Sequence, residues 1–325
     1  MHPLLEEYRN CRLCDRNCAV DRLAANKGFC GETAELRIAT ASIHKGEEPP
    51  ISGSGGSGTI FVTGCTLRCS FCQNWQISQK AMGAVVDTEL FVKICLALQA
   101  AGAENINIVT GSHAIPAIAL GLRASRAQGL RIPSLWNTSA YEKVQSIDLL
   151  SDVMDVYLPD LKTLDSEISA KYFLAPDYPA VAQAAIRRMV DLQALKFGPS
   201  LADSPSSAED EVLLSGVIIR HLVLPGYLKS TYKVLRWFAD TIGDRALLSL
   251  MTQYTPVNTS DKIPGRFIEQ QEYDTVLQWL EELGIEAGFY QELVPGSDWL
   301  PDFNCINPFS SELSKPIWHW SKGFI

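Results

Sequence analysis

The stretch GCTLRCSFCQNW, residues 64–75, places three cysteines within eight residues, at Cys65, Cys69 and Cys72. A structural zinc ion takes four protein ligands, and a cubane iron–sulfur cluster is ordinarily held by four cysteines. The spacing C-x3-C-x2-C supplies only three, so one iron of a [4Fe-4S] cluster bound here would stay open to another ligand. The pattern therefore indicates a reactive metal centre.

The composition is that of an ordinary globular protein, with 325 residues, 46% hydrophobic and 20% charged. A formal net charge of −9 disfavours binding to nucleic acid or to an anionic membrane. No apolar run approaches the roughly 20 residues of a membrane-spanning helix, and no signal peptide is evident. We therefore expect a cytoplasmic protein whose nine cysteines serve metal or thiol chemistry.

Strands and helices alternate along the chain. Apolar, β-branched runs predict strands at residues 59–64, 106–110, 132–137, 153–160, 216–226 and 246–254. Helical spacing of apolar residues predicts helices at residues 87–102, 116–129, 141–150, 178–195, 230–240 and 271–283. Six such units imply a parallel sheet. We expect a partial (β/α)6 barrel with its site at the carboxyl ends of the strands; a doubly wound open sheet is the alternative.

Three parts are expected. Residues 1–50 read as an irregular cysteine-rich segment, residues 51–290 as the partial barrel, and residues 291–325 as a C-terminal extension that packs on it. The stretch ISGSGGSG, residues 51–58, is either a flexible linker or a tightly packed turn. The polar residues 198–212 predict a loop or a disordered insert.

The cysteine motif, with its preceding strand and with Phe71 before the last cysteine, resembles the signature of radical S-adenosylmethionine (SAM) enzymes. The segments FVTGCTLRCSFCQNWQIS, NTSAYE, VYLPDLK and IRHLVLPG resemble the subfamily related to pyruvate formate-lyase activating enzyme. The resemblance implies that Cys65, Cys69 and Cys72 hold a [4Fe-4S] cluster whose open iron binds SAM. Reductive cleavage of SAM would then give methionine and a 5′-deoxyadenosyl radical that abstracts hydrogen.

The resemblance also implies which polar side chains hold SAM. By segment these are Asp160 and Lys162 in LPDLK, Asn137 and Ser139 in NTSAYE, and Arg220 and His221 in IRHLVLPG. A capping or structural role is the alternative for each. The second strand departs from the subfamily, because it ends IVTGSHAIP, without a carboxylate to contact the SAM amino group. His44, Glu47 and Glu48 match a further subfamily segment without an assignable mechanism.

The N-terminal cysteines form a second group with the spacing C-x2-C-x3-C-x11-C, at Cys11, Cys14, Cys18 and Cys30. Four thiols complete a metal shell, so a structural zinc ion and an auxiliary iron–sulfur cluster compete with free or disulfide-bonded cysteines. A small irregular segment would gain its fold from the metal. The isolated Cys95 and Cys305 are expected to be small core residues.

Two enzyme functions and one non-enzyme function are consistent with these patterns. The enzyme would abstract hydrogen from a glycine of a glycyl radical enzyme, or from a small molecule or another macromolecule. Either reaction requires an electron donor such as flavodoxin or ferredoxin. The non-enzyme alternative is an iron–sulfur or zinc scaffold protein.

Overall fold

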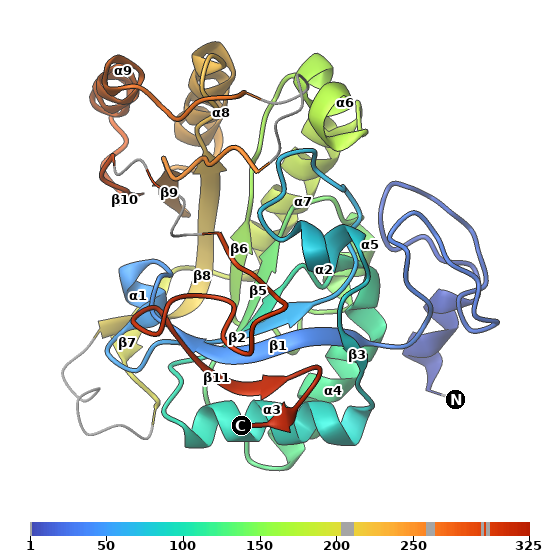
Figure 1. The fold of residues 1–325 in the computed structure, drawn as a ribbon. Helices are drawn as coiled ribbons and strands as arrows, with labels where there is room; N and C mark the ends of the chain where they lie inside the picture. The colour runs from blue at the N-terminus through green and yellow to red at the C-terminus, as the bar shows by residue number, and fades with distance from the viewer. Residues whose placement is uncertain (1, 203–210, 258–263, 294–295, 297–299) are drawn as a thin grey trace.

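A computed structural model describes residues 2–202, 211–257, 264–293, 296 and 300–325, and Figure 1 shows how they fold. Their strands form one sheet, with two short strands beside its main path: β3 (Ala84–Val85) pairs with β1, and β7 (Lys196–Pro199) pairs with β8. Across the sheet the other strands are β10 (Gly288–Tyr290), β9 (Leu247–Met251), β8 (Glu211–Leu222), β6 (Val156–Pro159), β5 (Ser134–Thr138), β4 (Ile106–Val109), β2 (Ser57–Val62), β1 (Arg37–His44), β11 (Ser314–His319) and β12 (Gly323–Phe324).

The six strands predicted from the sequence correspond to β2, β4, β5, β6, β8 and β9, and neighbouring members pair in parallel. The short β10 adds a further parallel pair to β9. Within the described sheet, β10 and β12 lie at opposite ends of the order and do not close on each other. The expected partial barrel is therefore confirmed.

Helices follow most of the parallel strands, as the sequence predicts. They are α1 (Pro49–Ser52), α2 (Trp75–Gln79), α3 (Thr88–Ala100), α4 (Ile115–Ala127), α5 (Val144–Asp148), α6 (Ser166–Phe173), α7 (Tyr178–Leu192), α8 (Leu228–Thr241) and α9 (Gln270–Glu282), with 3-10 turns at Pro3–Tyr8 and Ser112–Ala114. The Asp87 side chain caps the start of α3 by accepting the N–H of Leu90. No described helix is long and apolar enough to cross a membrane.

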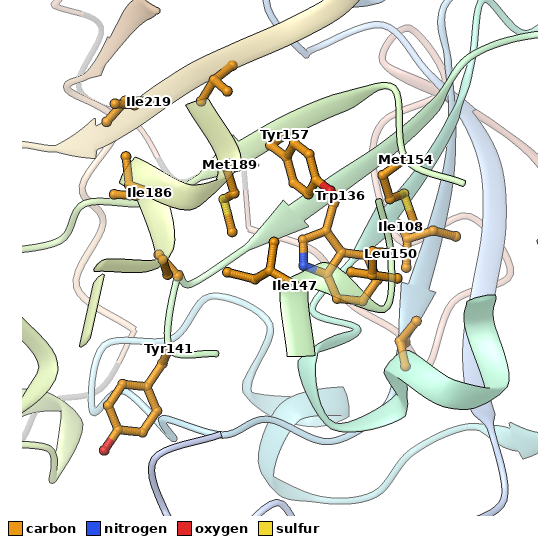
Figure 2. Close-up of a cluster of buried hydrophobic side chains, with 14 of the residues drawn as sticks. Ile108, Trp136, Tyr141, Ile147, Leu150, Met154, Tyr157, Ile186, Met189 and Ile219 are labelled. Carbon is orange, nitrogen blue, oxygen red and sulfur yellow. The ribbon is translucent and has the colours of Figure 1, made fainter. Parts of the chain in front are cut away.

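The main core lies between the strands and the helices that cover them. Figure 2 shows Trp136 of β5 beside Ile147 of α5 and Leu150, which follows that helix, with Met189 of α7 facing them. These side chains are essentially inaccessible to solvent. Burial of such large apolar groups is the main favourable term in folding, and here it fixes α5 and α7 against the strands whose ends form the site.

The expectation that residues 1–50 are irregular throughout is wrong at β1. This strand pairs antiparallel with β2 on one side and with β11 on the other. Its sequence, RIATASIH, alternates small polar and apolar residues that are almost all buried, so it lacks the continuous apolar run by which the other strands were recognised. The C-terminal extension does pack on the barrel, partly as β11.

The Gly/Ser-rich stretch is a packed turn that leads from α1 into β2, and not a flexible linker. A Cβ atom on Gly55 would lie 2.3 Å from the carbonyl oxygen of Gly102, and one on Gly58 would lie 2.4 Å from that of Asn105. Glycine is required at both positions because the backbone of the α3–β4 connection approaches so closely.

The predicted insert at residues 198–212 is wrong at its two ends. Gly198 pairs with Val212 and Pro199 with Glu211, in the antiparallel hairpin of β7 and β8. Its centre, residues 203–210, lies outside the described residues.

Candidate active site

A cavity of about 270 Å³ lies at the carboxyl ends of the parallel strands. Eight of the residues predicted from the sequence line it: Cys65, Cys69, Cys72, Asn137, Ser139, Asp160, Lys162 and Arg220. Strand ends that are separate in sequence meet there because the strands are parallel and adjacent.

The cysteine loop between β2 and α2 turns its thiols toward this cavity. The backbone N–H of Leu67 donates to the Cys65 sulfur at 3.4 Å, and the Cys72 sulfur accepts from the backbone of Asn74. The Ser78 hydroxyl lies 3.3 Å from the same Cys72 sulfur. Donors aimed at sulfur favour the thiolate, which is the form that binds metal.

Burial opposes the ionisation of two of these thiols, Cys69 and Cys72. Burial, together with the neighbouring Cys65, raises the pKa of Cys72 to about 11. Burial also raises the pKa of Cys69, although the nearby Lys162 ammonium acts in the opposite direction. Thiolates at these positions therefore require a bound cation to stabilise them.

The donor set fits a cluster better than a single ion. In the part of the chain that the structure describes, no three His, Cys, Asp or Glu side chains are grouped so as to hold a metal ion. A single ion needs ligands that converge on one point, whereas the three cysteines of a cubane each bind a different iron. Three thiols around one cavity satisfy the second requirement.

Lys162 and Asp160 form an ion pair on the cavity wall, with Nζ 2.5 Å from Oδ2. Burial lowers the pKa of Lys162, but the Asp160 carboxylate and Cys69 more than offset it, so the net pKa is raised. The Tyr178 hydroxyl accepts the N–H of Lys162 at 3.0 Å and donates to the Asp160 carbonyl at 2.6 Å. The strand end is thus fixed, and Lys162 is a cation.

The end of β5 contributes Asn137 and Ser139. Asn137 lies between Val109 of β4 and Leu158 of β6 in the strand register. The Ser139 hydroxyl is buried and has no hydrogen-bond partner among the described residues. A buried polar atom ordinarily has a partner, so this hydroxyl on the cavity wall fits a ligand with polar groups such as SAM.

Arg220 of β8 lies on the cavity wall and forms ion pairs with Glu47 and Glu48, to which the sequence analysis could assign no role. Its Nη2 lies 2.6 Å from Glu47 Oε2, and its Nε lies 2.8 Å from Glu48 Oε1. Asn107 of β4 donates to Glu47 at 3.3 Å. Arg220, Glu47 and His44 line the cavity. The sequence signals for this buried network were HKGEEP, which begins at the last residue of β1, and IRHLVLPG, which contains Arg220.

The placement of His221 on the cavity is wrong. Its Nδ1 lies 2.7 Å from the Leu161 carbonyl oxygen and its Nε2 lies 3.0 Å from the Thr231 hydroxyl of α8. Successive strand residues point to opposite faces, so Arg220 faces the cavity while His221 faces the helices. Burial lowers the pKa of His221 to about 4, and the ring is neutral.

The end of β4 does meet a carboxylate, but one from another segment. Ser112 donates to Glu142 Oε1 at 2.7 Å, and Trp136 Nε1 donates to the same atom at 3.2 Å. Glu142 is fully buried and does not line the cavity, whereas Thr110 does. The sequence could not reveal this pairing, because Glu142 follows the next strand.

The N-terminal thiols each accept a hydrogen bond. Donors are the Arg22 guanidinium for Cys11 (3.7 Å), the backbone of Arg16 for Cys14, the Phe29 N–H for Cys18 (3.3 Å) and the backbone of Glu32 for Cys30. Burial raises the pKa of Cys14 to about 12, and the other three cysteines act in the same direction. These thiols therefore influence one another, but in the described part of the chain they are, like the motif cysteines, not grouped so as to hold a single metal ion.

The C-terminal extension forms one side of the cavity through Pro301, Phe309 and Leu313. The expectation that Cys305 is a core residue is wrong, because it is exposed, with its sulfur 3.8 Å from Asp302 Oδ2. Cys95 is buried as expected.

Residues 59–192 match the model of the Radical SAM superfamily, which confirms the resemblance drawn from the cysteine motif. An uncharacterized protein of Methanocaldococcus jannaschii is 27% identical over 289 residues, which cover 86% of this chain and 76% of the relative.

A solved structure shares the fold, and a second shows a weaker likeness. A radical SAM methyltransferase from Sphaerobacter thermophilus superposes with a TM-score of 0.50 and 14% identity, over 72% of this chain and 66% of that one. SuiB of Streptococcus suis, bound to S-adenosylmethionine, gives a TM-score of 0.49 and 13% identity, over 70% of this chain and 48% of SuiB. This chain thus spans about half the length of SuiB.

Proposed function

We propose that this chain, whose residues 59–192 form a radical SAM domain, is an enzyme that binds a [4Fe-4S] cluster and SAM in the described cavity. The observation that carries the proposal is the convergence of Cys65, Cys69 and Cys72 with the Asp160–Lys162 pair on one cavity. A reduced cluster held by Cys65, Cys69 and Cys72 would supply the electron for cleavage of SAM to methionine and a 5′-deoxyadenosyl radical, and that radical would take a hydrogen atom from the substrate.

The chain's own residues bind and orient the reactants. Lys162 would pair with the methionyl carboxylate of SAM, because its ammonium is charged and lines the wall beside Cys69. Asp160, Asn137 and Ser139 would accept or donate hydrogen bonds to the ribose and the amino group. Phe71 and Leu67, both buried, limit the access of water to the cysteine loop.

Two substrates are proposed for this reaction. The first is a glycine of a glycyl radical enzyme, as the sequence resemblance to the pyruvate formate-lyase activating subfamily implies. The second, a small molecule, is favoured by one observation: Pro301, Phe309 and Leu313 of the C-terminal extension wall the cavity where a polypeptide loop would need room. The electron would come from a low-potential donor protein of the flavodoxin or ferredoxin class.

The substrate class can be tested by fractionating an extract of the source cells through a membrane that retains proteins. Each fraction is added to reduced, reconstituted enzyme with SAM, and 5′-deoxyadenosine is quantified. Stimulation by the retained fraction alone supports a protein substrate. Stimulation by the filtrate alone supports a small molecule and removes the activating role.

A second metal centre at Cys11, Cys14, Cys18 and Cys30 is also proposed. Its support is that all four thiols accept hydrogen bonds, as the sulfurs of Cys65 and Cys72 do. Zinc and an auxiliary cluster are separated by measuring zinc, iron and sulfide in a variant in which Cys65, Cys69 and Cys72 are all Ala. Zinc near one per chain identifies a zinc site, and iron with sulfide identifies an auxiliary cluster. The absence of both metals overturns the proposal.

The main proposal is tested by 5′-deoxyadenosine formation. The protein is reconstituted without oxygen, reduced and given SAM, in parallel with Cys72→Ala. Product from the wild type alone supports the enzyme. If a reduced cluster is present but the wild type neither forms product nor binds SAM, the protein is a scaffold and the proposal fails.

A further inference from the structure

Arg16 lies between Cys14 and Cys18 in the N-terminal segment, yet its side chain reaches the cysteine loop of the barrel. Its Nε donates to the carbonyl oxygen of Thr66 at 2.8 Å, and its Nη2 contacts that of Leu67 at 3.5 Å. Both carbonyls belong to the loop between Cys65 and Cys69. The guanidinium thus binds the backbone of the segment that carries the three cysteines.

The same guanidinium also binds the end of α6. Nη2 donates to the Phe173 carbonyl oxygen at 2.8 Å, and Nη1 donates to the carbonyl oxygen of Leu174. This end of α6 already contacts the cysteine loop, since the Ser70 N–H donates to the Tyr172 carbonyl at 3.0 Å. Arg16 therefore joins three chain segments at one point, with four carbonyl acceptors for its five N–H donors.

The backbone at both contacts adopts a conformation that needs support. Arg68, next to Leu67, has a φ of 58°, and Leu174 has a φ of 55°. Both values lie in the left-handed region, which costs a non-glycine residue free energy unless its surroundings hold it there. The hydrogen bonds from Arg16 to the neighbouring carbonyl oxygens are placed to hold Arg68 and Leu174 in this conformation.

Aromatic rings hold the guanidinium in position. Its central carbon lies 3.8 Å from the centroid of the Phe29 ring and 5.2 Å from that of Tyr141. Tyr141 follows Ser139 on the loop after β5, so the same contact reaches the proposed SAM-binding loop. A planar guanidinium can stack and donate several hydrogen bonds at once, whereas a lysine ammonium cannot reproduce this geometry.

We propose that Arg16 is a positioning residue that fixes the Cys65–Cys72 loop, so that its three thiols keep the arrangement required by the cluster. This inference rests on the proposed function, because it assumes that the loop binds a cluster. It assigns to the N-terminal segment a role in the site of the barrel, because Arg16 of that segment would position the loop whose cysteines bind the cluster.

The test compares Arg16→Gln and Arg16→Lys with the matched control Arg12→Gln, which removes the same charge from an exposed side chain of the same segment. Each protein is reconstituted without oxygen. The rate of iron release to a chelator and the electron paramagnetic resonance spectrum of the reduced cluster, with and without SAM, are recorded beside the thermal melt of the metal-free protein. The contribution of iron at the N-terminal cysteines is measured in the same variants carrying Cys65→Ala, Cys69→Ala and Cys72→Ala, and its release and spectrum are subtracted.

We expect both Arg16 variants to release iron at least tenfold faster than Arg12→Gln and to show a changed spectrum, at a temperature at which the melts show every metal-free protein to be folded. Phe29→Leu keeps Arg16 but removes the ring beside it. It should also speed iron release and change the spectrum, and it replaces the Arg16 variants in the test if they do not fold. Release rates and spectra equal to those of Arg12→Gln overturn the inference while leaving the proposed function intact. A parent protein that binds no cluster overturns both.

Discussion

The ammonium nitrogen of Lys162 lies 2.5 Å from Oδ2 of Asp160, and both side chains line the cavity that the three motif cysteines share. This pair is the best-defined charged element of the proposed SAM site. The Lys162 ammonium can bind the carboxylate of a ligand while it stays close to Asp160, so neither the ammonium nor the Asp160 carboxylate is left without a partner.

Lys162→Met should weaken SAM binding at least tenfold, which corresponds to about 1.4 kcal/mol. The variant removes the cation for the SAM carboxylate and leaves the Asp160 carboxylate unpaired on the same wall. Equilibrium binding of SAM to the reconstituted protein measures the effect. Lys93→Met, which removes an exposed lysine paired with Glu89 at 2.6 Å, is the control. Equal affinities for the two variants would remove Lys162 from the SAM site.

Arg220→Met should destabilise the protein by about 3–5 kcal/mol, because Glu47 and Glu48 would be left as buried charges without their cation. Adding Glu47→Gln and Glu48→Gln to the same protein should recover most of this loss. Urea denaturation gives the free energies of unfolding.

The control for Arg220 is Arg123→Met, which breaks an ion pair whose side chains are 35% and 55% exposed. Such a surface pair contributes about 1 kcal/mol or less. If Arg220→Met costs no more than this control, the buried network does not stabilise the fold.

The parallel strands could be predicted because each carries a local signal. The runs around Ile108, Trp136 and Ile219 are apolar, and each is buried in the sheet. The strand β1 was not predicted because its mixed sequence gives no local signal of burial. It is buried because it pairs with β2 and β11. Such a strand forms because of pairing with segments distant in the sequence, so its own sequence was not sufficient to predict it.

The site was predictable where a motif fixes residues close in sequence, as with Cys65, Cys69 and Cys72. The ion pairs and hydrogen bonds that hold the site were not predictable, because they join residues far apart in the sequence. Arg220 meets Glu48 across 172 positions of sequence, and Arg16 meets Phe173 across 157. His221 could not be assigned a face without knowing which side of β8 looks into the cavity.

His221 should make the protein less stable in mild acid. Its pKa is about 4 in the folded chain, lowered by burial, against about 6.5 when unfolded. The unfolded chain therefore takes up the proton first, and stability that is complete above about pH 6.5 is lost as the pH falls toward 4. Between pH 7.5 and pH 5 this one group should remove about 2 kcal/mol.

His221→Gln keeps a polar side chain but cannot titrate. Its unfolding free energy should fall about 2 kcal/mol less than that of the wild type between those pH values. His44 and His113, whose pKa values burial also lowers, are present in both proteins, so they cancel in the difference. Parallel pH profiles would show that His221 is not a buried neutral ring.

Phe303→Ala should detach the C-terminal extension from the barrel. Phe303 is fully buried, its ring centroid lies 5.4 Å from that of Phe61, and its N–H is accepted by Gln76 at 2.8 Å. Truncating such a core phenylalanine costs about 3–5 kcal/mol. Because the loss falls on the extension, limited proteolysis after residue 300 should accelerate more than cleavage elsewhere. Ile306→Ala, at a side chain 43% exposed, should change neither quantity appreciably. If both variants are digested like the wild type, the extension is not held by Phe303, and the wall formed by Phe309 must depend on other contacts.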